Sequence, residues 1–233
     1  MYQDIIYHPE FNLNMRFYFA QTKPAHATVI FYFGGGWKLG NPLQFEAHAQ
    51  ALSEIGFNVA LPDYRVSDRW EGCTPRDCVA DAIAAVQFLA DHHDEYGVNT
   101  QRFILGGGSA GGHLALCAEL LGSHRAIGLL LYNPAAVIPE HPAILKRFGS
   151  DYQALSPYHL LNRRLPPTII FHGLSDTTVP FTSTAAFAEK ARNYGSEVQI
   201  VAYVGKTHGF FNLQPDKDTV IAQTVDFVRS HFM

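Results

Sequence analysis

A serine between glycines joins an apolar run to a helical pattern near the middle of the chain. The segment Gly107-Gly108-Ser109-Ala110-Gly111 follows the apolar run 102–106 and precedes a helical pattern at 113–121. A Gly-x-Ser-x-Gly sequence at such a junction is typical of a nucleophile elbow, a sharp turn that lifts the serine oxygen above a sheet. A side chain at Gly107 or Gly111 would collide with the neighbouring strand or helix. Taken alone, the pattern is equally typical of a plain glycine-rich turn or a phosphate-binding loop.

A serine nucleophile needs a base to take its proton and an acid to orient that base. In open parallel sheets such groups gather at the carboxyl ends of the strands. Asp176 lies four residues after the apolar run that ends at His172, and His208 lies four residues after the run that ends at Val204. Singly, Asp176 fits a turn or helix-capping carboxylate, and His208 fits a surface-loop histidine. Together with Ser109 they predict a triad, with Glu197 and Asp216 as alternative acids.

A second glycine run follows the first central apolar run. Phe33-Gly34-Gly35-Gly36-Trp37 offers backbone N–H groups that no side chain obstructs, which is what an oxyanion hole needs. The N–H of Ala110, directly after the serine, is expected to join them. The aromatic residues on both sides disfavour the alternative of a merely flexible glycine loop.

Strand-like runs alternate with helical patterns almost throughout. The sequence predicts strands at 27–33, 57–62, 102–106, 127–132, 168–172 and 198–204, with a weaker edge strand at 15–19. It predicts helices at 44–55, 75–96, 113–121, 184–194 and 219–232. Continuous apolar strands alternating with amphipathic helices indicate an α/β fold with a mostly parallel sheet covered on both faces.

Length and composition predict one domain spanning residues 1–233. With 47% hydrophobic and 16% charged residues, the chain can bury one large core. The exception to the alternating pattern is 133–167, a polar stretch rich in proline. It is expected to form a small lid or substrate-binding insertion, although a plain surface excursion fits equally well.

Charge and cysteine content limit the classes of partner and the compartment to be expected for this chain. A formal net charge of −4 and the lack of a basic run give no reason to expect nucleic acid or a membrane surface. The start of the chain lacks a signal-peptide pattern, and Cys73, Cys78 and Cys117 have no metal-ligand spacing. His92-His93-Asp94 also lacks the spacing that would put metal ligands on one helix face. A cytoplasmic protein with reduced thiols and no metal is expected.

These motifs together resemble the α/β-hydrolase superfamily, in its esterase/lipase group with a His-Gly-Gly-Gly-type oxyanion motif. The resemblance extends from Val29 to His231. It rests on the Phe-Gly-Gly-Gly-Trp run, on Asp63-Tyr64-Arg65, on Gly-Gly-Ser-Ala-Gly-Gly-His-Leu-Ala, on His-Gly-Leu-Ser-Asp and on His-Gly-Phe. It implies an α/β-hydrolase fold without a large cap domain, and it is closest in kind to compact bacterial carboxylesterases and carbohydrate acetyl esterases.

The resemblance also implies the roles of the site residues. Ser109 would be the nucleophile, His208 the general base and Asp176 the acid that orients it. The N–H groups of Gly35, Gly36 and Ala110 would form the oxyanion hole, and no metal or organic cofactor would be needed. The chain departs from the family pattern at Phe33, where the motif usually has histidine. This replacement puts the rigidity of the loop in doubt more than the existence of the hole, because the donors are backbone groups.

The expected substrate is a small ester. Trp37, Tyr64 and Phe210 lie beside catalytic loops and are predicted to line the pocket, although core packing fits Phe210 equally well. Tyr64 more often anchors such a loop than binds a ligand. We expect hydrolysis of short acyl esters, acetyl first, on a carbohydrate or small alcohol. Feruloyl esters, amide or peptide substrates like those of arylformamidases and prolyl peptidases, and a catalytically silent binding module are the alternatives.

Overall fold

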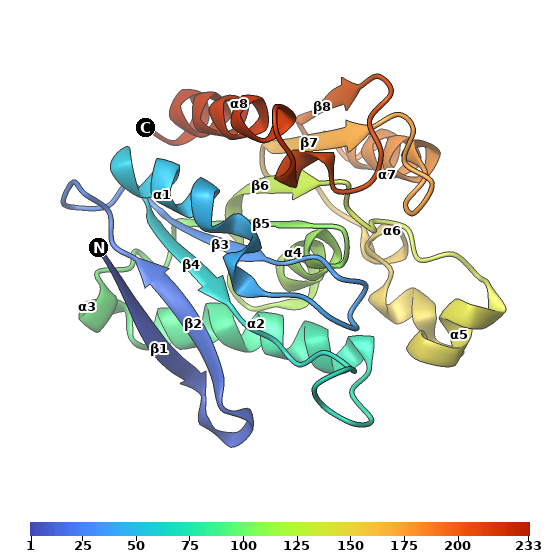
Figure 1. Cartoon of the computed structure of the whole chain (residues 1–233), viewed down its shortest axis with the longest axis horizontal. Helices are drawn as coiled ribbons and strands as arrows, with labels where there is room; N and C mark the ends of the chain where they lie inside the picture. The colour runs from blue at the N-terminus through green and yellow to red at the C-terminus, as the bar shows by residue number, and fades with distance from the viewer.

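The alternating runs build an eight-stranded sheet with helices on both faces (Figure 1). The computed structural model describes residues 1–233. The strands are β1 (Tyr2–His8), β2 (Leu13–Tyr18), β3 (Thr28–Tyr32), β4 (Asn58–Pro62), β5 (Phe103–Gly108), β6 (Ala126–Tyr132), β7 (Thr168–Gly173) and β8 (Val198–Tyr203). The helices are α1 (Glu46–Glu54), α2 (Pro75–Asp91), α3 (His93–Tyr96), α4 (Ala110–Leu121), α5 (Pro142–Phe148), α6 (Pro157–Leu160), α7 (Phe181–Asn193) and α8 (Asp216–Phe232).

The strand order is β1-β2-β4-β3-β5-β6-β7-β8. The strands from β4 to β8 in this order are parallel, while β1 and β2 pair antiparallel with their neighbours. The strand expected at 15–19 is present as β2, but it is not an edge strand, because β1 pairs with its outer side. Only Ile5 and Tyr7 of β1 are buried, so its apolar pattern was too weak to predict a strand.

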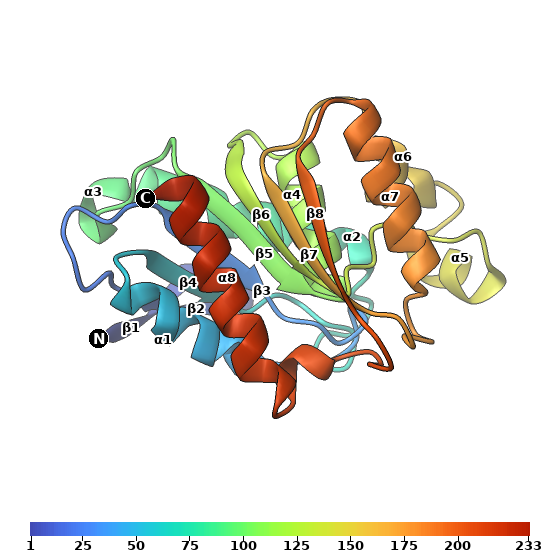
Figure 2. The ribbon, with the colours of Figure 1, turned by 90° about the horizontal axis from the view of Figure 1, so that it is seen from above.

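Two layers of helices enclose the sheet. Helices α1 and α8 lie side by side on one face, and α2, α4 and α7 cover the other (Figures 1 and 2). Every residue of β3 and β5 is buried, as expected for central strands that are covered on both faces. Because β3, β5, β7 and β8 run parallel, their carboxyl ends lie at one edge of the sheet. The predicted catalytic groups lie in the segments that follow these ends.

The helix boundaries differ from the prediction at several places, since α1 is shorter than 44–55 and α7 and α8 each begin three residues earlier than expected. The helix expected at 75–96 is divided at His92 into α2 and α3. Helix α4 begins at Ala110 rather than at His113, because Gly111 and Gly112 belong to its first turn. A Cβ atom at Gly111 would lie 2.0 Å from the carbonyl oxygen of Tyr32, so glycine lets α4 approach β3 closely.

The proline-rich stretch 133–167 contains α5, a short 3₁₀ turn at Tyr152–Leu155 and α6. It leaves the sheet after β6 and returns at β7 (Figure 1). This insertion is much shorter than the part of the chain that forms the sheet and the helices covering it. None of the helices combines the length and the apolar character that crossing a bilayer requires.

Candidate active site

Ser109 occupies a strained turn between β5 and α4. Its backbone has φ 54° and ψ −116°, a conformation that residues other than glycine rarely adopt. The turn is held by the N–H of Ser109, which donates to the carbonyl of Tyr132, and by its carbonyl, which accepts from Ala135 and His113. A Cβ atom at Gly107 would lie 2.5 Å from Gly111, which agrees with the steric argument from the sequence. Such strain at a half-buried serine is a common feature of functional sites.

Asp176 follows β7, and its buried carboxylate is surrounded by donors. Its Oδ1 accepts the N–H groups of Thr178 and Val179 at 2.8 and 2.9 Å. Its Oδ2 accepts from Nδ2 of Asn133 at 2.9 Å and from Nδ1 of His208 at 2.7 Å. Because every one of these groups donates, they suit an ionised carboxylate that has no proton of its own.

His208 lies in the loop that follows β8. Donation from Nδ1 to Asp176 fixes the tautomer and leaves Nε2 as the acceptor. Ser109 and His208 line one cavity of about 430 Å³. The hydrogen bond between the hydroxyl and the ring is not formed in this structure, as is frequent in the absence of substrate. The other acids named above are engaged elsewhere, Glu197 with His231 and Asp216 with Lys206.

Two residues beside Asp176 were not foreseen. Asn133 is fully buried with φ 44°, and its Oδ1 accepts the N–H of Gly173 while its Nδ2 holds Asp176. His172 lies with Nε2 3.4 Å from Oδ2 of Asp176 and donates to the carbonyl of Val179, and burial lowers its pKa. The one sequence signal for Asn133 is its type, since asparagine tolerates a positive φ at a strand end.

In the glycine run after β3, the carbonyls of Gly35 and Gly36 are hydrogen-bonded while their N–H groups are free. The carbonyl of Gly35 accepts the N–H groups of Lys38 and Leu39, and that of Gly36 accepts Nη2 of Arg147. The N–H groups of Gly35 and Gly36 make no hydrogen bond. A Cβ atom at Gly34 would lie 3.3 Å from that of Ser109, so the run touches the serine turn. Helix α4 begins at Ala110, where a first-turn N–H has no partner within the helix.

Phe33 holds this run by packing. Its ring stacks on Tyr64 with 4.0 Å between ring centroids and 15° between planes, and the hydroxyl of Tyr64 donates to the carbonyl of Phe33 at 2.7 Å. Oε1 of Gln44 accepts the N–H of Gly34 at 2.6 Å. These contacts constrain the loop although the histidine of the family motif is absent.

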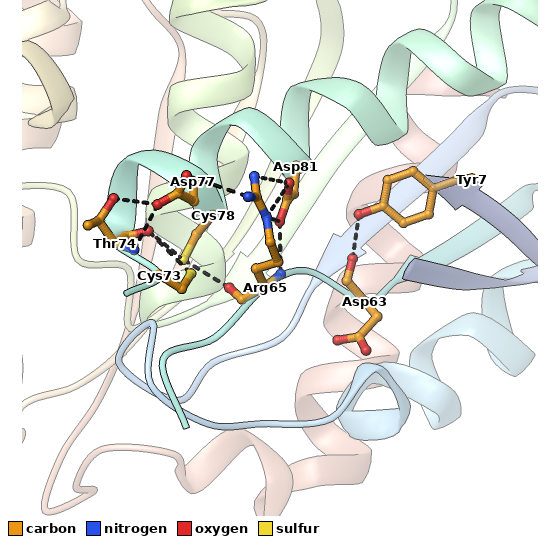
Figure 3. A network of polar contacts seen from close by, with 8 residues as sticks. All are labelled: Tyr7, Asp63, Arg65, Cys73, Thr74, Asp77, Cys78 and Asp81. Carbon is orange, nitrogen blue, oxygen red and sulfur yellow. Dashed lines mark hydrogen bonds and ion pairs between the residues drawn. The ribbon is translucent and has the colours of Figure 1, made fainter. Parts of the chain in front are cut away.

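A polar network around Arg65 lies next to the segment that holds the same loop (Figure 3). The guanidinium of Arg65 pairs with the fully buried carboxylate of Asp81 at 2.8 Å, which raises the pKa of Arg65. This pair fixes the segment after β4, whose Ser67 and Asp68 donate their N–H groups to the carbonyls of Trp37 and Lys38. In Figure 3, Cys73 and Cys78 lie beside Arg65 at the start of α2.

His113 ties the loop to α4 and to the proline-rich insertion. Its Nδ1 accepts Nε1–H of Trp37 at 3.1 Å, and its Nε2 donates to the carbonyl of Leu155 at 2.7 Å. Complete burial lowers its pKa to about 4, so the ring is neutral at pH 7.

Only one of the three predicted pocket aromatics lines a cavity. Trp37 lines a second cavity of about 520 Å³ that also reaches Ser109. Tyr64 and Phe210 are buried in the two cores and line neither cavity, which corrects the expectation. Tyr64 is covered by Phe33, and Phe210 packs against Tyr203. The neighbouring Phe211 lines the cavity near His208 instead.

The residues lining the second cavity come from the glycine loop, the insertion and the start of α7. They are Gly36, Trp37, Ser109, Ala135, Val137, Ile138, Pro139, Ile144, Arg147, Thr178, Val179, Pro180, Thr182 and Ser183. Ser109 therefore stands between an apolar cavity on this side and the His208 cavity on the other. No group of three or more His, Cys, Asp or Glu side chains is placed to hold a metal ion.

Comparison with protein families gives two matches. The BD-FAE family matches residues 15–138, and the prolyl oligopeptidase family matches residues 141–233. A probable isoprenylcysteine alpha-carbonyl methylesterase of Arabidopsis thaliana is 29% identical over 80% of this chain and 46% of its own length. Esterase LipC of Mycobacterium tuberculosis is 26% identical over 81% and 54%. The chain thus spans about half the length of these curated relatives.

Among solved structures, the likeness extends over whole chains. The apo form of esterase 2 from Thermogutta terrifontis has a TM-score of 0.92 and 32% sequence identity, and the match covers 98% of this chain and 94% of that one. The BD-FAE match alone covers more than half of the chain. The chain belongs to the BD-FAE family and is an α/β-hydrolase of the esterase/lipase group.

Proposed function

We propose that this chain hydrolyses short-acyl carboxylic esters, with Ser109 as nucleophile, His208 as general base and Asp176 as the acid that orients it. One observation carries the proposal. The buried Asp176 carboxylate holds Nδ1 of His208, whose ring shares a cavity with a serine on a strained turn. This is the arrangement that activates a serine hydroxyl in acyl transfer.

The reaction proceeds in two steps. Nε2 of His208 takes the proton of Ser109 as its oxygen attacks the ester carbonyl, and the N–H groups of Gly35, Gly36 and Ala110 stabilise the oxyanion. Collapse transfers the proton from His208 to the leaving alcohol and leaves an acyl-serine. A water molecule, deprotonated by the same ring, then releases the acid and restores the enzyme.

The two cavities beside Ser109 would bind the two parts of the ester, the alcohol and the acyl group. The alcohol must leave beside Nε2 of His208, because that atom protonates it. His208 lines the smaller cavity and not the larger one. We therefore assign the smaller cavity to the alcohol and the larger, apolar cavity to the acyl group.

The acyl cavity has room for more than an acetyl group. Its volume of about 520 Å³ and its Val137, Ile138 and Ile144 side chains favour a short aliphatic chain. Structures of the Thermogutta terrifontis esterase are described as butyrate bound and propionate bound. We propose acyl groups from acetyl to hexanoyl as substrates.

The alcohol cavity suits a hydroxyl-rich leaving group such as a carbohydrate. Asn41, Gln44 and Asn212 line it beside His208. The amide oxygens of Asn41 and Gln44 accept backbone N–H groups, so their NH₂ groups are left to donate to substrate hydroxyls.

An ester series tests these assignments. We expect kcat/KM to peak between the acetate and hexanoate esters of p-nitrophenol and to fall for the decanoate, whose chain exceeds the cavity. Acetylated xylo-oligosaccharides should be better substrates than ethyl acetate. Ser109→Ala should lower kcat by roughly 10⁴ or more on every ester. A variant that keeps a tenth of the activity would refute the proposal.

Amide hydrolysis is the second candidate, because the prolyl oligopeptidase family matches residues 141–233. An aminoacyl-p-nitroanilide and a formanilide in the same panel separate the two functions. Faster turnover of either amide than of p-nitrophenyl butyrate would favour it.

A further inference from the structure

Arg147 is the one charged side chain that lines the acyl cavity. It extends from α5 in the insertion, and the other thirteen lining residues carry no charge. From this position we infer that the acyl cavity takes acyl groups ending in a carboxylate, such as those of monoesters of short dicarboxylic acids. The inference rests on the proposed function, since it names the class of acyl group transferred to Ser109.

The guanidinium has no acidic partner. Five of the eleven arginines form an ion pair with a carboxylate, and of the six that do not, Arg147 is the one that lines the acyl cavity. Arg147 instead makes a single hydrogen bond, from Nη2 to the carbonyl of Gly36. A guanidinium carries five N–H donors in a planar fork, so most of its donors are free. A half-buried arginine without a counterion can bind an anion through its free N–H groups, here in a protein whose net charge is −4.

The guanidinium and the proposed nucleophile face the same cavity. Arg147, Gly36 and Ser109 all line it, and the guanidinium donates to the carbonyl of Gly36, a residue whose N–H is a proposed oxyanion donor. An acyl group that is attached to Ser109 and ends in a carboxylate can therefore place its charge in the cavity that Arg147 lines, and a short dicarboxylic acid such as glutaric acid is the simplest acyl group of this kind.

The surroundings fix the orientation of the fork and favour a mixed acyl group. The guanidinium carbon lies 5.5 Å from the centre of a Trp37 ring, which restricts its movement. Val137, Ile138 and Ile144 provide apolar contacts for the methylene groups. Because Arg147 also holds the carbonyl of Gly36, a carboxylate bound to Arg147 would affect the position of the loop that carries Gly36. Binding of the acyl carboxylate would therefore be coupled to the geometry of the proposed oxyanion hole.

A matched pair of ethyl esters tests the inference. Monoethyl glutarate ends in a carboxylate, and the ethyl ester of glutaramic acid is its neutral isostere. Both release ethanol, which a coupled assay measures. We expect kcat/KM for the carboxylate to exceed that for the carboxamide by about 10- to 100-fold, the range of a charge-assisted hydrogen bond. Added salt should reduce this ratio because the attraction is electrostatic.

Arg147→Gln should bring the ratio to about one or below. The variant lowers both absolute rates, because it also removes the bond to Gly36, so the ratio is the informative quantity. Arg147→Lys, which keeps the charge and loses the fork, should give an intermediate ratio. Lys146→Gln removes a neighbouring exposed charge of the same helix that does not line the cavity, and should keep the wild-type ratio.

Two results would overturn the inference. One is a wild-type ratio of one or less, and the other is an equal loss on both esters in Arg147→Gln, which would leave Arg147 as a support for Gly36 alone. Failure of the proposed function would look different, because Ser109→Ala would then still hydrolyse both esters.

Discussion

Asp176 combines two tasks that depend on its charge. It accepts Nδ1–H of His208 and thereby leaves Nε2 as the acceptor atom, and it accepts three further donors from Asn133, Thr178 and Val179 that anchor it. An amide in its place would present an NH₂ group to neighbours that are all donors. The position thus requires a carboxylate for local stability and, in the mechanism that we propose, for catalysis as well.

Asp176→Asn should lower kcat on p-nitrophenyl butyrate by about 10³- to 10⁴-fold with a smaller change in KM, because the ring would take the wrong tautomer. Steady-state kinetics on protein shown by circular dichroism to be folded measures this effect. Asp216→Asn is the matched control, since its carboxylate pairs with Lys206 and should be dispensable for turnover. A larger loss in Asp216→Asn than in Asp176→Asn would contradict the assignment.

The sequence singles out some residues of the proposed site and not others, for a physical reason. Ser109, Asp176 and His208 can be predicted because each follows an apolar strand, and parallel strands bring their carboxyl ends together. Asn133, His113 and Arg147 act through contacts with residues far away in the chain, and no local pattern announces such contacts. Tyr64 and Phe210 were misplaced because neighbouring residues in a loop can face the core or the cavity.

At the level of elements, the central strands were predictable and the periphery was not. The runs at β3 to β7 are continuous and mostly apolar, as expected for strands that helices cover on both faces, whereas the edge strand β8 is mostly half-buried or exposed. Strand β1 was missed because most of its side chains face solvent. The break between α2 and α3 at His92 lies within a continuing helical pattern, so periodicity could not locate it.

The insertion 133–167 shows what composition alone leaves open. Its prolines indicated irregular structure, and the structure places α5 on the acyl cavity through Ile144 and Arg147. Leu155 of the same insertion accepts from His113, which in turn holds Trp37. The insertion thereby contacts α4 and, through His113, the glycine loop after β3.

Two fully buried histidines, His48 and His113, are neutral at pH 7 because burial lowers the pKa of each ring. His48 is enclosed by Phe31, Phe45 and Tyr132 with no partner for either ring nitrogen, and its burial lowers its pKa to about 3. Burial also lowers the pKa of His113 to about 4. In the unfolded chain both rings would titrate near pH 6.5. Between these values the unfolded chain binds more protons, so stability is lost as pH falls below about 6.5.

We therefore expect the free energy of unfolding to decrease from about pH 7 to pH 5, by up to ~1.4 kcal/mol per pH unit for each such ring. Urea unfolding at several pH values measures this slope. His48→Phe should make the slope shallower, because one titrating group is removed from the unfolded chain and no hydrogen bond is lost. His92→Gln, at the exposed end of α2, is the control. An unchanged slope in His48→Phe would contradict this account.

The central claim is that one activated serine, Ser109, forms the covalent acyl-enzyme. Reaction of the folded protein with a fluorophosphonate, followed by mass spectrometric mapping of the adduct, tests it most directly. We predict one adduct per chain, located on Ser109 and absent from the Ser109→Ala variant. An adduct on another residue, or no adduct in protein that still hydrolyses p-nitrophenyl butyrate, would contradict the claim.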